Sequence, residues 1–256
     1  MSAKILFIDI ETAPMLVYTW GIWEQNIGLN QIVKDSHLLS FAAKWLDKPE
    51  MYYADQRNAR SMEYDKPLLK QIWNLLNEAD IVIGHNSKEF DTKVVNTRFI
   101  INGMQPPSTY KQIDTKELTK KSCRFVSNKL EYLSDQVCEK HKKHKHHKFS
   151  GFELWKECLA GNMDAWDEME KYNKIDVLAL EELYLKMQPW GNTYNPDLYT
   201  SGTVSSCTCG CKIFTKKGFR YTAVGKYQAY KCTRCGAKRA SRTNLMDKNK
   251  RDSLRN

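Results

Sequence analysis

The chain has no long hydrophobic run. None of its 256 residues lies in an apolar stretch near the roughly 18 residues that a membrane-spanning helix requires. The first residues also lack the basic, apolar and small-residue segments of a secretory signal peptide. These absences exclude an integral membrane protein. They predict a soluble, intracellular protein of the cytoplasm that has no membrane partner.

A disulfide framework is missing as well. Of the eight cysteines, only Cys123, Cys138 and Cys158 lie outside the C-terminal segment. Three separated thiols in a reducing compartment are typical of packed or surface side chains. The other five cysteines fall between residues 207 and 235, and this density predicts a metal site.

The five clustered cysteines form two halves of a zinc-binding pattern. The downstream half has C-x-x-C-G spacing, whereas the upstream half, about 20 residues earlier, is C-x-C-G-C and departs from the usual C-x-x-C. Glycine follows the second cysteine of each half, which favours four ligands for one structural Zn²⁺: Cys207, Cys209, Cys232 and Cys235. Cys211 can replace either upstream ligand. Four thiolates leave no open position for catalysis at the zinc.

Acidic residues are scarce in this same segment. Residues 201–256 hold 14 Lys and Arg against 2 Asp and Glu, a net of +12, while residues 1–200 hold 26 against 28, a net of −2. A basic appendage on a near-neutral body predicts a polyanionic partner such as nucleic acid, although a merely solubilising tail is the alternative. Aromatic side chains that can stack on bases or fill a small core lie among the charges: Phe214, Phe219, Tyr221, Tyr227 and Tyr230.

The first candidate catalytic acids belong to a buried strand. Between Lys4 and Glu11, apolar side chains occupy both odd-numbered and even-numbered positions, which predicts a central strand covered on both faces. Side chains alternate along a strand, so Asp9 and Glu11 project from one face. Two such carboxylates repel each other and lose hydration, a cost that a divalent metal compensates. The alternative is that the strand has ended and both acids lie in a solvated turn.

Another candidate acid follows a second apolar run. Residues Ile81–Ile83 predict a short buried strand that enters a tight turn, and Ser87 is the expected N-cap of the next helix. Asp91 then lies in the first turns, where the helix dipole favours an anion, so a helix-start acid is the alternative to a metal ligand. His85 fits a turn or packing role better than a ligand. Asn86 either holds the turn or touches substrate.

The strongest helical pattern in the chain carries the last acid. Apolar residues recur at helical spacing from Asp164 to Met187, and Tyr172 and Asp176 form an i, i+4 pair on one face. This pairing suits a hydrolase in which the acid holds a metal and the hydroxyl orients the attacking water. A half-buried tyrosine with an exposed aspartate is the alternative. The joint occurrence of the three segments in this order favours the metal site.

In this order, the D-x-E, N-x-x-x-F-D and Y-x-x-x-D segments resemble the three motifs of the DnaQ-like (DEDD) 3′–5′ exonucleases, in the subgroup with tyrosine in the third motif. The resemblance covers roughly residues 1 to 190 and implies a ribonuclease H-like fold. Other segments resemble a narrower group of phage and bacterial predicted exonucleases with a C-terminal zinc ribbon: Ala43–Leu46, Ser127–Leu130, Gly151–Trp155 and Gly161–Trp166. A phage origin would place the protein in the host cytoplasm.

The resemblance implies a mechanism. Four acids would hold two Mg²⁺ or Mn²⁺ ions: Asp9, Glu11, Asp91 and Asp176. Tyr172 would orient the nucleophilic water. Two metals roughly 4 Å apart stabilise the attacking and leaving oxygens of a phosphodiester. The expected function is a 3′–5′ exonuclease, with DNA favoured over RNA and a possible protein partner at the zinc ribbon. A structure-specific endonuclease on the same fold and a non-catalytic nucleic-acid-binding protein are the alternatives.

Two further stretches have open interpretations. Residues 140–148 are all basic or titratable, which is typical of a solvated loop but also suits a phosphate-contacting or metal-binding loop. Residues 13–36 hold Tyr18, Trp20 and Trp23, which either stack against a terminal base or cover the sheet. The candidate substrate contacts of the whole chain are Thr12, Trp20, Trp23, Asn86, Lys142, Lys143, Lys145, Arg220 and Arg234.

Periodicity along the chain predicts an α/β fold. It comprises a ribonuclease H-like mixed five-stranded sheet with flanking helices, plus a small C-terminal zinc ribbon. We expect strands near residues 4–11, 37–46, 50–54, 80–84 and 110–114. We expect helices near residues 65–78, 88–102, 128–139 and 164–187. The predicted domains are an exonuclease domain at 1–190, a linker at 191–206, a zinc ribbon at 207–242 and a basic tail at 243–256.

Overall fold

The computed structural model describes residues 3–142, 148–191, 193–202 and 204–254. The chain forms two compact units, and each is described by itself. The larger unit, called the body here, is Lys4–Tyr184, and the smaller contains Leu185–Asn256. Among the described residues, no helix is both long and apolar enough to cross a membrane.

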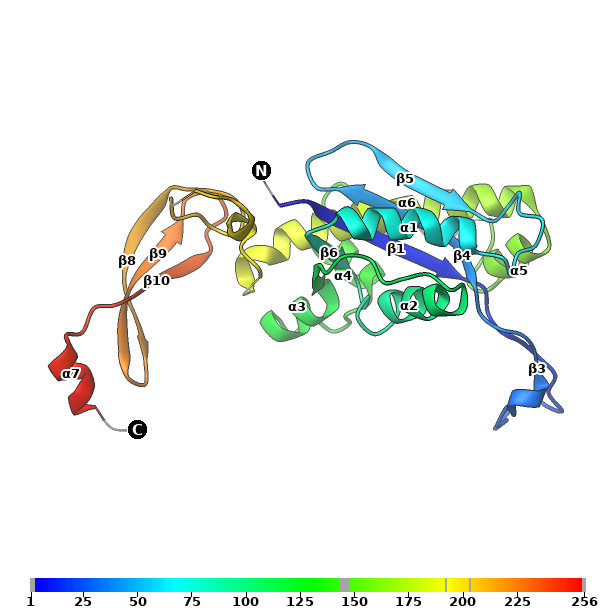
Figure 1. Ribbon diagram of the computed structural model, residues 1–256, viewed down its shortest axis with the longest axis horizontal. Helices are drawn as coiled ribbons and strands as arrows, with labels where there is room; N and C mark the ends of the chain where they lie inside the picture. The colour runs from blue at the N-terminus through cyan, green and yellow to red at the C-terminus, as the bar shows by residue number, and fades with distance from the viewer. Residues whose placement is uncertain (1–2, 143–147, 192, 203, 255–256) are drawn as a thin grey trace. The chain divides into compact units, whose positions relative to one another are not determined.

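A mixed five-stranded sheet forms the centre of the body (Figure 1). Its strand order is β5-β4-β1-β6-β7, in which β4 and β5 run antiparallel to their neighbours and β6 and β7 are parallel to β1. The strands are β1 (Ile5–Thr12), β4 (Leu38–Trp45), β5 (Met51–Asp55), β6 (Ile81–Gly84) and β7 (Lys111–Asp114). The predicted mixed sheet is therefore confirmed, and β1 occupies its central position.

Helices cover both faces of this sheet. On one face, α1 (Lys66–Glu78) and α2 (Asp91–Ile101) pack their apolar side chains against β1 and β4. On the other face lie α5 (Glu153–Leu159) and α6 (Met163–Met187), whose core includes the fully buried Trp166. Burial on both faces explains why β1 is apolar at both parities.

Two shorter helices complete the body. The helix α3 (Thr115–Ser122) follows β7 directly, with Asp114 as its N-cap, and α4 (Leu130–Val137) comes after a loop. The sequence pattern predicts α4 but neither α3 nor α5. The missed helices α3 and α5 are eight and seven residues long, so each carries only about two turns of helical period.

The expected cap of α2 is wrong. Phe90 occupies the N-cap position of α2. Ser87 lies three residues before Phe90 and is almost fully buried. A Cβ on Gly84 would lie 2.4 Å from the Cβ of Ser87, so the turn folds Ser87 back against β6. The Ser87 hydroxyl instead accepts a hydrogen bond from Gln112 at 3.2 Å. Close packing of the turn thus overrides the capping preference of serine.

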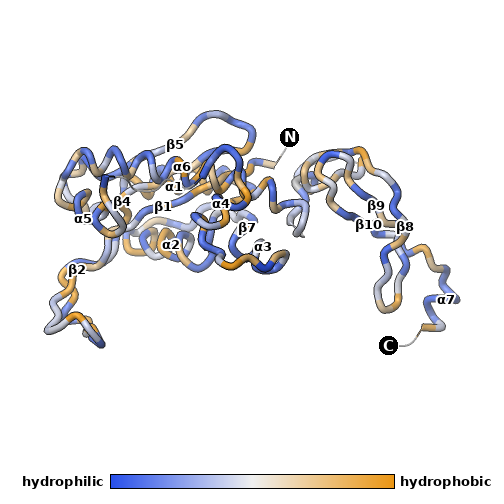
Figure 2. The backbone as a smooth tube through the Cα atoms, turned by 180° about the vertical axis from the view of Figure 1, so that it is seen from behind, coloured by the Kyte–Doolittle hydropathy of each residue, from blue (hydrophilic) through white to orange (hydrophobic). Residues whose placement is uncertain are grey.

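The segment between β1 and β4 forms a two-stranded arm, defined here as residues 13–36 (Figure 2). It contains β2 (Leu16–Val17) paired antiparallel with β3 (Ile32–Lys34). A short 3-10 helix, η1, precedes β3 at Leu29–Gln31. The side chains of Trp20 and Trp23 on this arm are 99% and 80% exposed. The alternative in which these aromatics cover the sheet is therefore wrong.

A three-stranded antiparallel sheet dominates the smaller unit, in the order β10-β9-β8. The strands are β8 (Phe214–Thr222), β9 (Gly225–Cys232) and β10 (Lys238–Asn244). Short helices flank it: η2 (Gln188–Trp190), η3 (Pro196–Tyr199) and α7 (Lys248–Ser253). Its buried cluster consists mainly of cysteines together with Ala237 and Phe214. So little apolar material cannot by itself stabilise a fold of this size.

Candidate functional site

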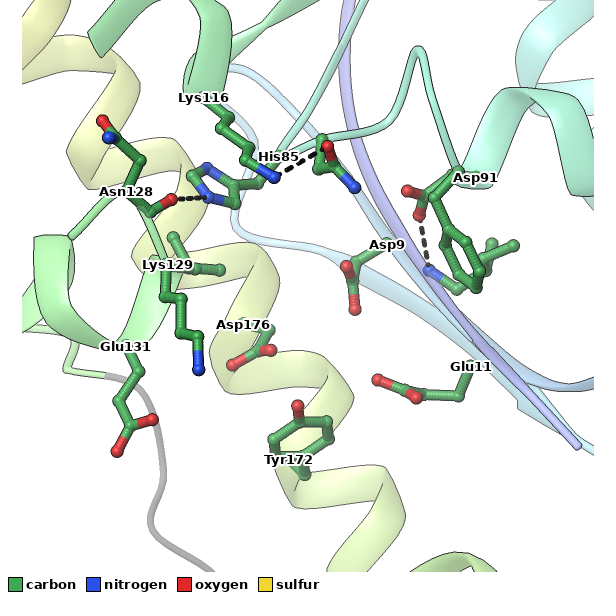
Figure 3. Close-up of a pocket in the computed structure, with 14 residues that line it drawn as sticks. Asp9, Glu11, His85, Asp91, Lys116, Asn128, Lys129, Glu131, Tyr172 and Asp176 are labelled. Carbon is green, nitrogen blue, oxygen red and sulfur yellow. Dashed lines mark hydrogen bonds between the residues drawn. The ribbon is translucent and has the colours of Figure 1, made fainter. Parts of the chain in front are cut away.

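The two acids of the first motif extend from the central strand (Figure 3). Asp9 and Glu11 alternate with the buried Ile8 and Ile10 along β1, and both acids are half-buried. The strand continues to Thr12, so the alternative of a solvated turn at these acids is wrong. Their carboxylates therefore leave a fixed backbone on one face of the sheet.

Asp91 is the first residue of α2 and is 7% exposed. Its Oδ1 accepts a hydrogen bond from the backbone N–H of Ile10, at 3.2 Å, which ties the start of α2 to β1 between the first two acids. The preceding turn is held by Asp114, whose carboxylate accepts the backbone N–H groups of Asn86 and Lys88. Asn86 has a φ of +65°, a left-handed conformation that asparagine tolerates better than most residues.

Tyr172 and Asp176 lie one turn apart on α6, and both are buried. In Figure 3 the Tyr172 hydroxyl points toward the Asp176 carboxylate, whose charge helps to raise the pKa of the phenol. Asp176 is only 3% exposed, so the alternative of an exposed aspartate is wrong. The long helix thus directs one phenol and one carboxylate toward the acids of β1 (Figure 3).

All five of these side chains line one cavity of about 340 Å³. Segments separated by more than 160 residues in the sequence therefore meet around a common space. The remaining lining residues are Ile10, His85, Asn86, Phe90, Lys116, Asn128, Lys129, Leu130 and Glu131. Lys129, at the start of α4, stands beside the acids in Figure 3.

Burial and mutual repulsion govern the electrostatics of this cavity. Burial raises the pKa of Tyr172 well above its ordinary value, and the charges of Asp176, Glu11 and Asp9 raise it further. Burial also raises the pKa of Asp91 to about 6, against the hydrogen bonds from its own amide and from Ile10. Acidic side chains thus gather at a partly buried cavity, and a divalent cation would relieve their repulsion.

The donor set fits magnesium or manganese. Hard divalent ions prefer carboxylate and other oxygen ligands, and four carboxylates face the cavity together. Asp9, Glu11, Asp91 and Asp176 are therefore the residues that can hold such ions. His85 does not add a ligand, because one ring nitrogen lies 2.8 Å from Thr115 Oγ1 and the other 2.9 Å from the Asn128 carbonyl.

Comparison with known proteins places the chain in a family. The model of the RNase H superfamily matches residues 28–188. The chain belongs to the RNase H superfamily. The matched range holds Asp91, Tyr172 and Asp176, while Asp9 and Glu11 lie on β1, which joins this range through its pairing with β4 and β6. The predicted ribonuclease H-like fold is confirmed, and the family supports a nuclease-type function on nucleic acid.

Solved structures include a similar chain of much greater length. The family B DNA polymerase of the hyperthermophilic archaeon Pyrobaculum calidifontis matches with a TM-score of 0.47 and 12% sequence identity over 73% of this chain. The RNase H superfamily protein described here spans about a quarter of that polymerase, since 25% of the polymerase chain is covered. A search of curated proteins gave no match.

Two residues that touch the candidate acids were missed in the sequence. Asn173, fully buried on α6, donates from Nδ2 to Asp9 Oδ2 at 2.7 Å and accepts a hydrogen bond from Ser40. Trp155, on α5, donates from its indole Nε1 to Glu11 Oε2 at 3.1 Å. No local spacing signals either contact, because the partners lie 164 and 144 residues apart.

The predicted substrate contacts are dispersed. Among those in the described part of the chain, only Asn86 lines the cavity, where its side-chain oxygen accepts a hydrogen bond from Lys116 at 3.1 Å. Thr12 ends β1 outside the cavity lining, the two tryptophans lie on the arm, and Lys142 is exposed. Lys143 and Lys145 lie outside the described residues. Arg220 and Arg234 are exposed in the smaller unit, where Arg234 donates to the Cys209 carbonyl at 3.1 Å.

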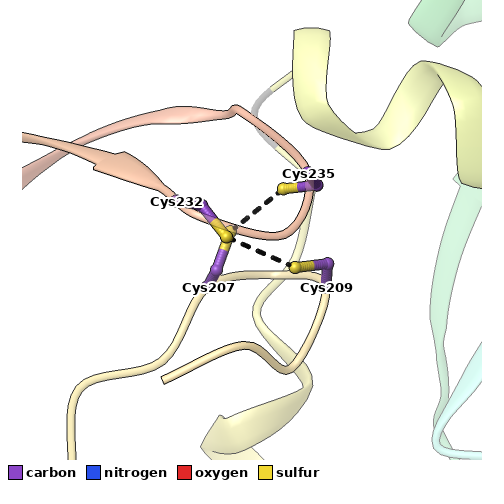
Figure 4. A group of neighbouring side chains, drawn as sticks. All are labelled: Cys207, Cys209, Cys232 and Cys235. Carbon is purple, nitrogen blue, oxygen red and sulfur yellow. Dashed lines mark hydrogen bonds between the residues drawn. The ribbon is translucent and has the colours of Figure 1, made fainter. Parts of the chain in front are cut away.

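The smaller unit of this RNase H superfamily protein brings four cysteines together (Figure 4). The sulfur atoms of Cys207, Cys209, Cys232 and Cys235 all lie within 4.8 Å of one another. The Cys207–Cys235 and Cys209–Cys232 pairs are separated by 3.6 and 3.7 Å. Tetrahedral zinc with Zn–S bonds near 2.3 Å requires S–S separations of about 3.8 Å. The cluster therefore has the spacing of a structural zinc site.

Cys211 stands outside this cluster. Its sulfur accepts the backbone N–H of Ile213 at 3.4 Å and lies 3.6 Å from the Thr233 hydroxyl. Within the cluster, burial raises the pKa of Cys207, but hydrogen bonds from the Cys209 amide and Cys235 outweigh it and bring the pKa to about 7. A thiol with this pKa supplies the thiolate that zinc requires.

Zinc removal should unfold the smaller unit and leave the body folded. We expect Cys232→Ser to lose the bound zinc and the strand signal of β8–β10 in circular dichroism, because the cysteine cluster is the core of that unit. Zinc content is measured by atomic absorption on purified protein. Cys211→Ser is the matched control and should retain one zinc per chain. Loss of zinc in that control would contradict the ligand set.

The raised pKa of Asp91 predicts a pH dependence of stability. Above pH 4 the folded protein keeps a proton on Asp91 that the unfolded chain releases, so stability without Mg²⁺ or Mn²⁺ should fall as pH rises from about 4 to about 6. A shift of about two pKa units corresponds to about 3 kcal/mol. Asp91→Asn, which retains an acceptor for Ile10, should lack this dependence. Urea unfolding of the zinc-loaded proteins at pH 4.5 and 7.5 compares them; parallel pH profiles would contradict the prediction.

Proposed function

We propose that this protein is a metal-dependent 3′–5′ exonuclease of the DnaQ-like DEDD group, in its tyrosine subgroup. The observation that carries the proposal is the convergence of four carboxylates and one tyrosine on a single cavity. Their order along the chain is the order of the three exonuclease motifs. Membership in the RNase H superfamily supports the same class of chemistry.

In this proposal Asp9, Glu11, Asp91 and Asp176 hold two Mg²⁺ or Mn²⁺ ions. When bound, such ions stabilise charge on the attacking and leaving oxygens of the phosphodiester and lower the pKa of a bound water. The protein supplies the positions of the ligands, since β1, α2 and α6 are fixed by core packing on both faces of the sheet. The site is thereby organised before substrate arrives, which is how an electrostatic site acts most effectively.

Tyr172 acts as a hydrogen-bonding partner for the attacking water. Because its pKa is raised, the phenol remains protonated at neutral pH and cannot serve as the general base. Its hydroxyl and the Asp176 carboxylate line the same cavity, so the phenol can hydrogen-bond a water beside that acid. This arrangement assigns orientation to the tyrosine and charge to the carboxylates.

Nucleic acid, with DNA favoured over RNA, is the proposed substrate, and the smaller unit is its proposed second contact. Exposed lysine and arginine side chains line β8, where Tyr221 is 67% exposed. Lys226 lies 4.1 Å from the centre of the Phe219 ring, so charge and aromatic surface occur side by side. Such a combination binds phosphates and stacks bases. Trp20 and Trp23 on the arm are proposed as further stacking surfaces for an unpaired strand.

Single substitutions of the acids should abolish hydrolysis without unfolding the protein. We expect Asp9→Ala, Glu11→Ala, Asp91→Ala and Asp176→Ala each to reduce the rate by orders of magnitude, because each removes a metal ligand. The assay follows 5′-labelled and 3′-labelled DNA and RNA with Mg²⁺ or Mn²⁺. A ladder shortening from the 3′ end supports the proposal. Internal cuts support the endonuclease alternative, and no metal-dependent cleavage of any of these substrates supports the non-catalytic one.

The tyrosine variant should be milder than the acid variants. Tyr172→Phe removes one hydrogen-bonding group at the water and leaves every carboxylate in place, so we expect a loss of roughly 10²- to 10³-fold in kcat. Single-turnover kinetics on a labelled oligonucleotide measures the step. A loss equal to that of Asp176→Ala would contradict a purely orienting role.

Neutralising three charges on β8 should weaken binding and flatten its salt dependence. We expect the full-length triple variant Lys216→Gln, Lys217→Gln, Arg220→Gln to lower the log–log salt slope by about 2 on single-stranded DNA, at about 0.7 per lost phosphate contact. Fluorescence anisotropy across a salt series measures this slope. The matched control replaces three exposed body lysines, Lys48, Lys70 and Lys111, with glutamine. An equal fall of the salt slope in the control variant would contradict a specific contact between β8 and nucleic acid.

A further inference from the structure

The helix α5 carries a side chain that touches two of the five proposed catalytic residues. The indole Nε1 of Trp155 donates to Glu11 Oε2 at 3.1 Å. The indole ring also meets the ring of Tyr172 edge to face, with centroids 6.0 Å apart and planes at 79°. Trp155 is therefore a neighbour of a metal-binding candidate from β1 and of the water-orienting candidate from α6.

The indole is itself held in place by the core. Its neighbour Leu154 and the next-turn residue Cys158 are fully buried, and both pack with Trp166 and Met169 of α6. Trp155 is partly buried and packs against the same cluster, which restricts the movement of its ring. Its indole N–H points to Glu11. A donor fixed in this way constrains the group that accepts from it.

Orientation matters more for Glu11 than for the aspartates. A glutamate has one more side-chain torsion than an aspartate, so more rotamers must be excluded before its oxygens reach a metal. The hydrogen bond from Trp155 engages Oε2 and restricts the rotation of the Glu11 carboxylate. Asn173 makes the equivalent contact to Asp9, at 2.7 Å.

We propose that Trp155 is a positioning residue of the metal site, which orients the Glu11 carboxylate toward the cation and buttresses the Tyr172 ring. The proposal rests on the proposed function, because it takes Glu11 as a metal ligand. Residues that hydrogen-bond metal ligands typically change metal affinity or activity by about 10- to 100-fold when they are replaced. Trp155 should act through Glu11 and not by contact with substrate.

The test measures metal binding apart from hydrolysis. Mn²⁺ binding to the zinc-loaded, full-length protein is followed by titration calorimetry without nucleic acid, for wild type, Trp155→Phe and Trp73→Phe. We expect Trp155→Phe to weaken Mn²⁺ binding about 10- to 100-fold. Trp73→Phe is the matched control, because Trp73 also donates its indole N–H, to the Gln105 carbonyl at 2.8 Å, but lies outside the cavity lining. That control should bind Mn²⁺ as wild type does.

A double-mutant cycle separates positioning from general packing. In a Glu11→Ala background, Trp155→Phe should have little further effect on Mn²⁺ affinity, because its partner is already absent. Equal losses in both backgrounds would overturn the proposal. So would wild-type Mn²⁺ affinity in Trp155→Phe. If Trp155→Phe fails to fold, benzothienylalanine at position 155 replaces only the N–H by sulfur, and the same two outcomes apply.

Activity gives an independent readout. With increasing Mn²⁺, Trp155→Phe should show a half-saturating concentration raised by about the same factor as its binding constant, while kcat at saturation recovers to within a few-fold of wild type. A lowered kcat with unchanged metal dependence would overturn the positioning role. A different outcome would separate the two proposals. If Mn²⁺ binding follows the predicted pattern but the wild-type protein hydrolyses no nucleic acid, the proposed function is refuted and the positioning role remains.

Discussion

Repulsion among acidic side chains is the constraint on which the rest of this structure depends. Four carboxylates face one cavity, in which burial, together with the charge of Asp114, raises the pKa of Asp91 to about 6. The fold keeps them there by donors from other elements, since Asn173 holds Asp9 and Trp155 holds Glu11. A divalent cation would relieve the repulsion among these carboxylates, so the unfavourable electrostatics of the metal-free cavity and the chemistry proposed for the metal-bound one have the same origin.

Elements whose pattern reports burial directly could be predicted from the sequence. The strand β1 is apolar at both parities and lies at the centre of the sheet, and α6 begins within one residue of its predicted start. Local spacing also selected Asp9, Glu11, Asp91, Tyr172 and Asp176, which the structure brings around one cavity. Each motif lies at the end of an element or on one face of it, where chain geometry determines direction, and the joint occurrence of the three motifs in one order outweighed the alternative interpretation of each motif alone.

Contacts that join distant segments could not be predicted in this way. Trp155 ends a segment that resembles an exonuclease group, but nothing in that segment indicates its contact with Glu11, and Asn173 is simply the polar neighbour of Tyr172 in the sequence. Ser87 has a capping side chain, yet the close approach at Gly84 buries it. The aromatics of the arm resemble a sheet cover in sequence, because hydrophobicity alone does not say whether a segment folds back or extends. Each of these contacts depends on tertiary packing. The local hydrophobic periodicity of a single sequence does not report such packing.

The order of the acids along the chain has a consequence for synthesis. Asp176 lies on α6, the last helix of the body, so a growing chain on the ribosome has three of the four carboxylates long before it has the fourth. Domains fold largely from the N-terminus as they emerge, and the cavity closes only when α6 packs across the finished sheet. For the proposed nuclease, this order would delay hydrolytic competence until the body has been translated, so that an incomplete chain would not cleave nearby nucleic acid.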